Sequence, residues 1–129
     1  MALETSTVSK KALWAGRIIS GIIVLMLTFS AVMKFVRPPA VTEEFDRLQL
    51  PARITIALGI LELTCAVIYA IPQTAVLGAI LVTGYLGGAI LTHLRIADPF
   101  WSPIVLGVLA WLGLYLRDPR VRALMPLRK

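Results

Sequence analysis

Cysteine and histidine are almost absent from these 129 residues, since the sequence has one of each. The single cysteine, Cys65, cannot form an internal disulfide, and it lies in an apolar stretch where a small packing role suffices. Without a Cys/His cluster, no zinc or iron–sulfur site is expected. The sequence also lacks a phosphate-binding glycine loop, a zincin His pair and a nucleophile elbow. It therefore has none of these common signatures of hydrolases and nucleotide-binding enzymes.

Acidic residues are scarce as well, with 7 Asp and Glu against 13 Lys and Arg, a net charge of +6. In a soluble protein this balance would suggest nucleic acid as a partner. Here the basic residues flank apolar runs, which fits membrane topology and anionic lipid headgroups instead. Hydrophobic residues make up 58% of the chain, above the roughly 45–50% of soluble domains. We therefore expect a membrane protein whose surroundings are the lipid bilayer, and no nucleic-acid partner.

Four apolar stretches are long enough to cross a bilayer core of about 30 Å as helices. They cover about residues 13–35, 53–71, 75–95 and 100–117. Between the first two, Val41, Phe45 and Leu48 recur at helical spacing, which predicts a short amphipathic helix on the membrane surface or over the end of the bundle. The predicted fold is an all-α membrane protein, a four-helix transmembrane bundle forming one domain over residues 1–129.

Short signals between these stretches predict how the helices connect. The link Pro72-Gln73-Thr74 is so brief that the second and third helices must be antiparallel neighbours. Asp98 before a proline reads as the N-cap of the last helix. Gly84 and Gly88 have the small-xxx-small spacing that is typical of close helix contacts in membranes.

An even number of spans places both ends of the chain on one side of the membrane. That side carries eight basic residues: Lys10, Lys11, Arg17, Arg117, Arg120, Arg122, Arg128 and Lys129. The opposite side carries five: Lys34, Arg37, Arg47, Arg53 and Arg95. Because basic residues are enriched on the cytoplasmic side, both termini are predicted to be cytoplasmic.

Glu62 lies at the middle of the second apolar stretch, where a carboxylate costs roughly 2.5–3.5 kcal/mol on insertion scales. The cost is tolerable if the side chain faces other helices and has a partner, or if it stays protonated. Arg17, about one turn inside the first stretch, is the expected partner. Such a group either fixes the register of the helices or serves as a proton-exchanging or ligand-binding acid, and the sequence leaves both interpretations open.

His93, the only histidine, lies near the end of the third stretch. If it faces inward with Glu62, the two line one cavity that opens toward the non-cytoplasmic side, with Thr92 near the mouth and Tyr69 and Tyr85 farther in. A mostly apolar cavity with a few convergent polar groups is typical of a small-molecule site, and imidazole groups exchange protons near neutral pH. The polar residues expected to support this site are Arg17, Lys34 and Asp98.

Four short segments, taken with their order and spacing, resemble the DoxX-like membrane proteins over about residues 10–118. The segments are Ser30-Ala-Val-Met-Lys34-Phe with Pro38-Pro39, Leu50-Pro51, Gly59-Ile-Leu-Glu62, and Thr92-His93-Leu94-Arg95-Ile-Ala-Asp98-Pro99. The resemblance implies a multi-pass, four-helix protein of the prokaryotic cytoplasmic (inner) membrane. It also implies that five residues match recurring polar positions of the family: Arg17, Lys34, Glu62, His93 and Asp98.

The family takes its name from a small subunit of a thiosulfate:quinone oxidoreductase, but this chain is similar to the broad branch whose members mostly lack an assigned activity. It has no cysteine pair for sulfur chemistry, so thiosulfate oxidation is not expected. The resemblance supports at most a quinone-like or lipid-like ligand, held by a redox-accessory module beside a membrane or redox partner protein. The alternatives are a structural or assembly subunit without a ligand, and a proton-dependent isomerase or transporter. Whether the chain is an enzyme or a homo-oligomer stays open.

Overall fold

The computed structural model describes residues 8–125, and over that range the chain forms helices and no strand. The long helices are α1 (Lys10–Val36), α3 (Thr55–Ala70), α4 (Ala75–Leu94) and α5 (Trp101–Arg117). The short ones are α2 (Pro39–Arg47), α6 (Pro119–Leu124) and the 3-10 turns η1 (Ala52–Ile54) and η2 (Pro72–Thr74). The prediction of an all-α bundle is confirmed, and so is the short amphipathic helix, which is α2.

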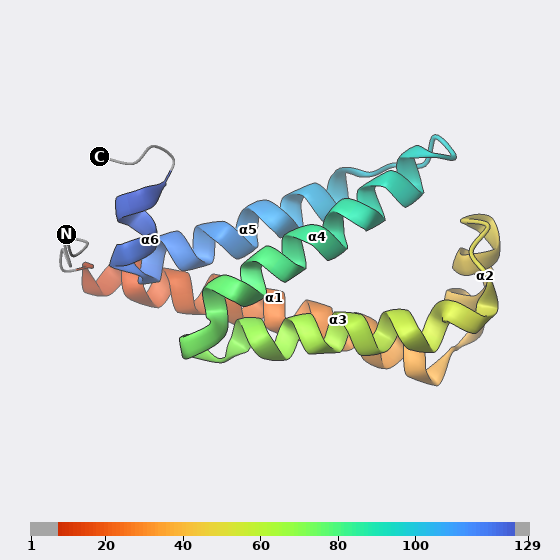
Figure 1. Cartoon of the computed structure of the whole chain (residues 1–129), viewed down its shortest axis with the longest axis horizontal. Coiled ribbons are helices and arrows are strands. Elements are labelled where there is room, and N and C mark those ends of the chain that lie inside the picture. The colour runs from red at the N-terminus through yellow and green to blue at the C-terminus, as the bar shows by residue number, and fades with distance from the viewer. Residues whose placement is uncertain (1–7, 126–129) are drawn as a thin grey trace.

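The four long helices form an up-and-down bundle in which successive helices run in opposite directions (Figure 1). Helix α1 packs against α3 and α5, and α4 packs against the same two, so the order around the bundle is α1, α3, α4, α5. The start of α1 and the end of α5 lie at one end, here called the terminal end, together with α6 (Figure 1). The opposite end, called the α2 end, holds α2 and the α4–α5 connection. Arg128 and Lys129, which were counted for the orientation, lie outside the described residues.

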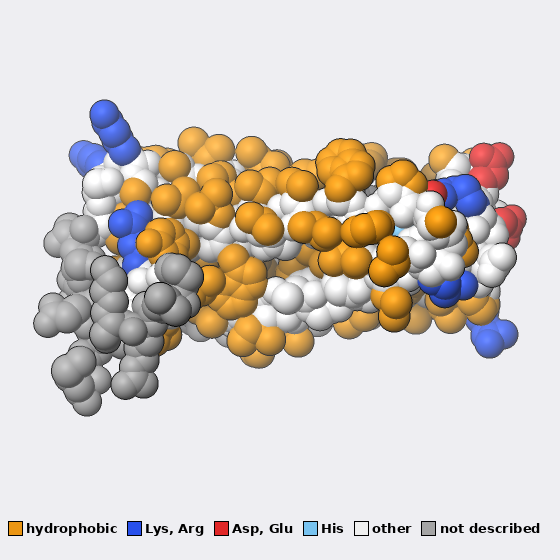
Figure 2. All heavy atoms as spheres, turned by 90° about the horizontal axis from the view of Figure 1, so that it is seen from above, with side chains coloured by type: hydrophobic (Ala, Val, Ile, Leu, Met, Phe, Trp, Pro, Cys, Tyr) orange, Lys and Arg blue, Asp and Glu red, His pale blue; other side chains and the backbone are white. Residues whose placement is uncertain are grey.

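The surface of the bundle matches a bilayer. Figure 2 shows hydrophobic side chains covering the middle of the molecule, whereas charged side chains gather at its two ends. Three helical stretches, Lys10–Val36, Ala52–Ala70 and Pro72–Leu94, are long and apolar enough to cross a membrane. Helix α5 is apolar but has 17 residues, which is near the lower limit of about 17 for a span. The chain is thus a membrane protein, and the crossing of all four helices stays a prediction.

Glycines bring the helices close together, but not the two that the sequence pattern selected. A Cβ atom added to Gly78 would lie 2.3 Å from the backbone of Tyr69, and one on Gly16 would lie 2.7 Å from a backbone oxygen of α5. These positions require glycine because the backbones themselves touch there. A Cβ atom on Gly84 or Gly88 would meet nothing within 4 Å. The predicted small-xxx-small contact is therefore wrong, and both residues lie beside open space.

The end of α4 has a backbone conformation that brings Asp98 back toward the helix. Ala97 has a left-handed backbone, with φ of 56°, and two hydrogen bonds close the turn: Ala97 N–H to Leu94 O (3.0 Å) and Asp98 N–H to His93 O (2.9 Å). This pair of bonds is a Schellman motif. Helix α5 begins only at Trp101, so Asp98 is not its N-cap as predicted, and the carboxylate is directed to the end of α4 instead.

Candidate functional site

A cavity of about 630 Å³ occupies the α2 half of the bundle. All four long helices and α2 contribute to its wall. The apolar lining includes Phe45, Leu48, Leu58, Leu61, Leu86 and Leu106. The polar lining includes Ser30, Lys34, Glu62, Tyr85, Thr92 and His93. The volume falls within the roughly 300–1,000 Å³ of small-molecule sites, and the mixture of many apolar and few polar groups is typical of them.

The deepest polar group in this cavity is the buried ion pair of Glu62 and Lys34. Glu62 is 4% exposed, and its Oε1 lies 2.9 Å from Lys34 Nζ, which also donates to Ser30 Oγ at 2.9 Å. Glu62 thus faces the interior and contacts the first helix, as predicted, but the expected partner was wrong. Arg17 is 17 residues before Lys34 on α1, about 26 Å along a helix, and its guanidinium lies over the Trp14 ring instead.

The ion pair leaves hydrogen-bonding capacity on the cavity side. Glu62 accepts from Lys34 through Oε1, and the Tyr85 hydroxyl lies close enough to the same carboxylate to be a further donor to it. The Lys34 ammonium carries three donors, of which two are used. A carboxylate and an ammonium that are both partly free can together bind a ligand that accepts and donates hydrogen bonds. The signal that could have identified Lys34 is its i, i+4 spacing from Ser30, which puts both on one face of α1.

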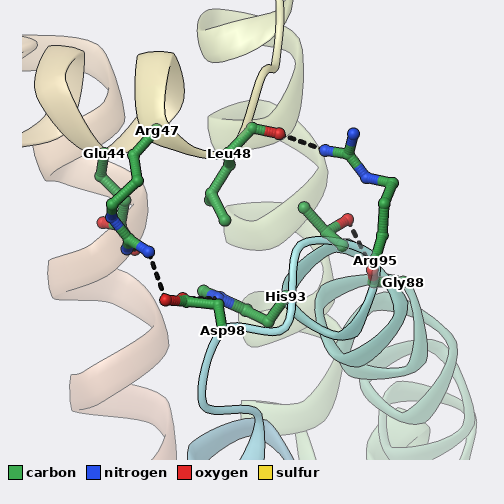
Figure 3. A network of polar contacts seen from close by, with 8 residues as sticks. Glu44, Arg47, Leu48, Gly88, His93, Arg95 and Asp98 are labelled. Carbon is green, nitrogen blue, oxygen red and sulfur yellow. Dashed lines mark hydrogen bonds and ion pairs between the residues drawn. The ribbon is translucent and has the colours of Figure 1, made fainter.

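His93 is fixed by a second polar group at the α2 end of the cavity. Its Nδ1 lies 2.7 Å from Asp98 Oδ2, and Asp98 Oδ1 lies 2.5 Å from Arg47 Nη1 (Figure 3). The Arg47 guanidinium, followed by His93, holds the pKa of Asp98 below its usual range. Because the carboxylate is ionised, the imidazole Nδ1 must donate the hydrogen bond, which leaves Nε2 for other partners.

The same contacts hold α2 over the cavity. Arg47 of α2 reaches Asp98, and Arg95 donates to the Leu48 carbonyl at the end of α2 (Figure 3). Phe45 and Leu48 are buried against the bundle, at 7% and 5% exposure. Asp98 thus joins His93 of the cavity wall to Arg47 of α2, a link that the sequence did not predict. A basic residue on an amphipathic helix ordinarily faces solvent, so nothing in the sequence singled out this arginine.

The structure separates the two tyrosines that the sequence placed in one cavity. Tyr85 and Thr92 line it with Glu62 and His93, and the Thr92 hydroxyl donates to the Gly88 carbonyl at 2.8 Å. Tyr69 is not among its lining residues. It is fully buried nearer the terminal end, where its hydroxyl donates to the Ala110 carbonyl at 2.6 Å. Tyr69 therefore packs between α3 and α5, outside the α2-end cavity in which the sequence placed it.

The cavity reaches the lipid-facing surface between α3 and α4. Leu61 of α3 lines it and is 49% exposed, and the exposed Gly84 and Gly88 line it from α4. These two helices diverge from their tight turn toward the α2 end (Figure 1). Glycine leaves the gap free of side chains, so the wall opens sideways to the bilayer as well as toward the α2 end, where Pro99 and Ser102 are exposed lining residues.

One comparison with known proteins gives a match. The family model described as the DoxX-like family matches residues 18–113, most of the chain. No curated protein and no solved structure matches. The matched range includes the polar lining of the cavity and the Arg47–Asp98–His93 contacts.

Proposed function

The chain belongs to the DoxX-like family, and from that premise we propose that this membrane protein binds a quinone-like or lipid-like molecule in its α2-end cavity. With this molecule bound, the protein would act as a redox-accessory module beside a membrane or redox partner protein. The observation that carries the proposal is the cavity itself. It is about 630 Å³, mostly apolar, and has a nine-tenths buried acid on its wall.

The lining fits a molecule with a polar ring or head and an apolar tail. Lys34 supplies a donor at the deep end, where the Glu62 carboxylate and the Tyr85 hydroxyl also line the cavity. His93 Nε2 supplies a second polar contact toward α2. Leucines between these groups suit an apolar ring or chain. A structural role without a ligand would favour a filled interior, and the cavity argues against that alternative.

A quinone, when bound, supplies the two-electron and two-proton chemistry that none of these side chains has. The chain's own residues hold and orient the ligand and exchange its protons. Asp98 keeps Nδ1 of His93 protonated, so that Nε2 is the atom that takes a proton from a ligand hydroxyl. Lys34 directs a donor at a ligand carbonyl, and Glu62 keeps the ammonium in place.

A ligand of this kind is dissolved in the bilayer, and the gap between α3 and α4 offers it a lateral route. The route passes Leu61 on one side and the glycines Gly84 and Gly88 on the other. Side chains larger than hydrogen at those two positions would project into open space at the gap. With glycine at both positions, no side chain there blocks entry from lipid.

The test is binding of short-tailed ubiquinone and menaquinone analogues to the detergent-solubilised chain, measured by tryptophan fluorescence quenching. We expect saturable binding to wild type, and a loss of roughly tenfold in affinity for Glu62→Gln and for His93→Ala, because each removes a hydrogen bond to a charged or polarised group. Asp46→Asn is the control, since Asp46 is an exposed acid of α2 outside the cavity.

Two results would reject the proposal. One is that no analogue binds wild type above its partitioning into detergent. The other is that Glu62→Gln and His93→Ala bind as tightly as wild type and Asp46→Asn. In either case the Lys34–Glu62 pair would serve only to fix α1 against α3, as in a structural or assembly subunit.

A further inference from the structure

A second cavity, of about 500 Å³, lies toward the terminal end, between α1, α3 and α5. Its wall combines Arg17 of α1 and Arg117 of α5 with the apolar residues Val24 and Leu25. Leu25 is 70% exposed, so the apolar side of this cavity continues onto the surface of α1 that lipid chains contact. Two guanidinium groups and a lipid-facing surface therefore meet in one place.

Arg117 is held there by a chain of hydrogen bonds. Its Nε donates to Ser20 Oγ at 3.1 Å, and its guanidinium lies over the Tyr69 ring, 5.8 Å from the centroid. The Tyr69 hydroxyl lies 3.2 Å from the same Ser20 Oγ and donates to the Ala110 carbonyl at 2.6 Å. Ser20 and Tyr69 are buried, so this edge of the guanidinium is fixed. The Nη groups have no hydrogen-bond partner among the described residues.

Neither arginine forms an ion pair with a carboxylate within residues 8–125. Asp118, next to Arg117 in the chain, caps α6 through the Arg120 N–H at 2.9 Å and pairs with Arg120 Nε at 3.6 Å. The Arg17 guanidinium lies 5.1 Å from the Trp14 ring centroid, which orients the cation without neutralising it. Two like charges on one cavity repel each other, and an anion between them removes that repulsion.

We propose that this second cavity binds the phosphate group of an anionic phospholipid. Arginine's planar fork binds phosphate oxygens in a bidentate manner, and the free Nη groups of Arg117 present such a fork. Val24 and Leu25 would contact the first part of an acyl chain, which favours a lipid over free inorganic phosphate. Basic groups at the membrane surface attract anionic lipids in general, and here two of them share a shaped site. The site is separate from the α2-end cavity.

The experiment is native mass spectrometry of the solubilised full chain, incubated separately with phosphatidylglycerol, phosphatidylcholine and inorganic phosphate. We expect wild type to retain phosphatidylglycerol in preference to the other two. Arg17→Gln should weaken that retention roughly fivefold, and Arg17→Gln with Arg117→Gln should weaken it further. Lys11→Gln is the control, because it removes one exposed positive charge at the same end, outside the second cavity.

Arg17 is exposed, so its substitution tests the site without depending on a folded Arg117 variant. Equal retention of phosphatidylcholine and phosphatidylglycerol by wild type would overturn the proposal. So would unchanged retention in Arg17→Gln, or an equal loss in Lys11→Gln, which would mean that net charge alone attracts the lipid. Binding of inorganic phosphate as strongly as phosphatidylglycerol would replace the lipid by the free ion.

Discussion

At the scale of single residues, the buried Lys34–Glu62 ion pair is the contact whose disruption should destabilise the folded state most. Removing one partner leaves an uncompensated buried charge, which costs about 3–5 kcal/mol in buried pairs. We therefore expect Lys34→Met to lower the free energy of unfolding by that amount in detergent, measured by titration with sodium dodecyl sulfate. Glu62→Gln should be milder than Glu62→Leu, because an amide keeps part of the hydrogen bonding.

The double variant Lys34→Met with Glu62→Leu supplies the decisive comparison for this pair. Removing both charges leaves no buried ion, so the double variant should be more stable than Lys34→Met alone. A double variant as unstable as the sum of the two single variants would mean that the residues do not interact as the 2.9 Å contact indicates.

The stability of α2 should depend on the protonation state of Asp98. Arg47 and then His93 lower its pKa from the ordinary value of 3.8. A carboxyl group with a lowered folded pKa adds stability above its unfolded pKa and loses it as the pH falls through the folded value. We expect the amide protection factors of residues 41–47 in α2 to be high at pH 7 and to fall below about pH 4.

Two variants separate this effect from general acid unfolding. Asp98→Asn should lower the protection of α2 already at pH 7, with no further loss in acid that depends on this residue. Glu44→Gln should behave as wild type, because Glu44 pairs with the same arginine only at 3.8 Å and is half exposed. Identical profiles for wild type and Asp98→Asn would show that the Arg47 contact does not hold α2.

At the scale of helices, α4 has glycines both at the lateral opening of the α2-end cavity and away from it, so substitutions at the two kinds of position can be compared. Gly84 and Gly88 line the α2-end cavity at its lateral opening, whereas Gly87 does not, and a Cβ atom on any of the three would meet nothing within 4 Å. Gly88→Leu should slow ligand association, because the side chain fills the gap to lipid. Stability should stay the same or rise by up to about 1 kcal/mol, since glycine is a poor helix former.

The control, Gly87→Leu, has the same gain in helix propensity on the lipid-facing surface outside the opening. It should leave ligand association unchanged in stopped-flow fluorescence measurements. If wild type binds the ligand and both Gly88→Leu and Gly87→Leu associate with it at the same rate, the ligand reaches the cavity by another path. That result would reject the lateral route but not the binding site.

The sequence predicted the elements well because apolar length and proline breaks mark them directly. It predicted that Glu62 faces inward because exposure of a carboxylate to lipid is costly. The partner of Glu62 depends on how far α1 and α3 slide along each other, and the apolar pattern of the sequence does not determine that register. The contact of Asp98 with His93 depends on a left-handed Ala97, where glycine is usual, so the sequence carried no signal for that turn.

At the scale of the whole molecule, the orientation in the membrane stays a prediction from basic residues. Lys11 lies at the terminal end and Glu43 at the α2 end, and both are exposed. In intact cells, a membrane-impermeant thiol reagent should label Glu43→Cys and leave Lys11→Cys unlabelled until the membrane is opened. The native Cys65 is buried and should not react. The reverse labelling pattern would invert the orientation, and equal labelling of both would refute the four-span topology.

The claim that a lipid-soluble ligand occupies the α2-end cavity is tested most directly by photolabelling with a diazirine-bearing ubiquinone analogue, mapped by mass spectrometry. The predicted labels fall on the cavity wall, at Glu62, Tyr85, Leu61 and their neighbours, and excess unlabelled analogue suppresses them. Labels confined to lipid-facing residues such as Leu25, Leu77 and Val108, with no competition by the unlabelled analogue, would show that the α2-end cavity does not bind the ligand.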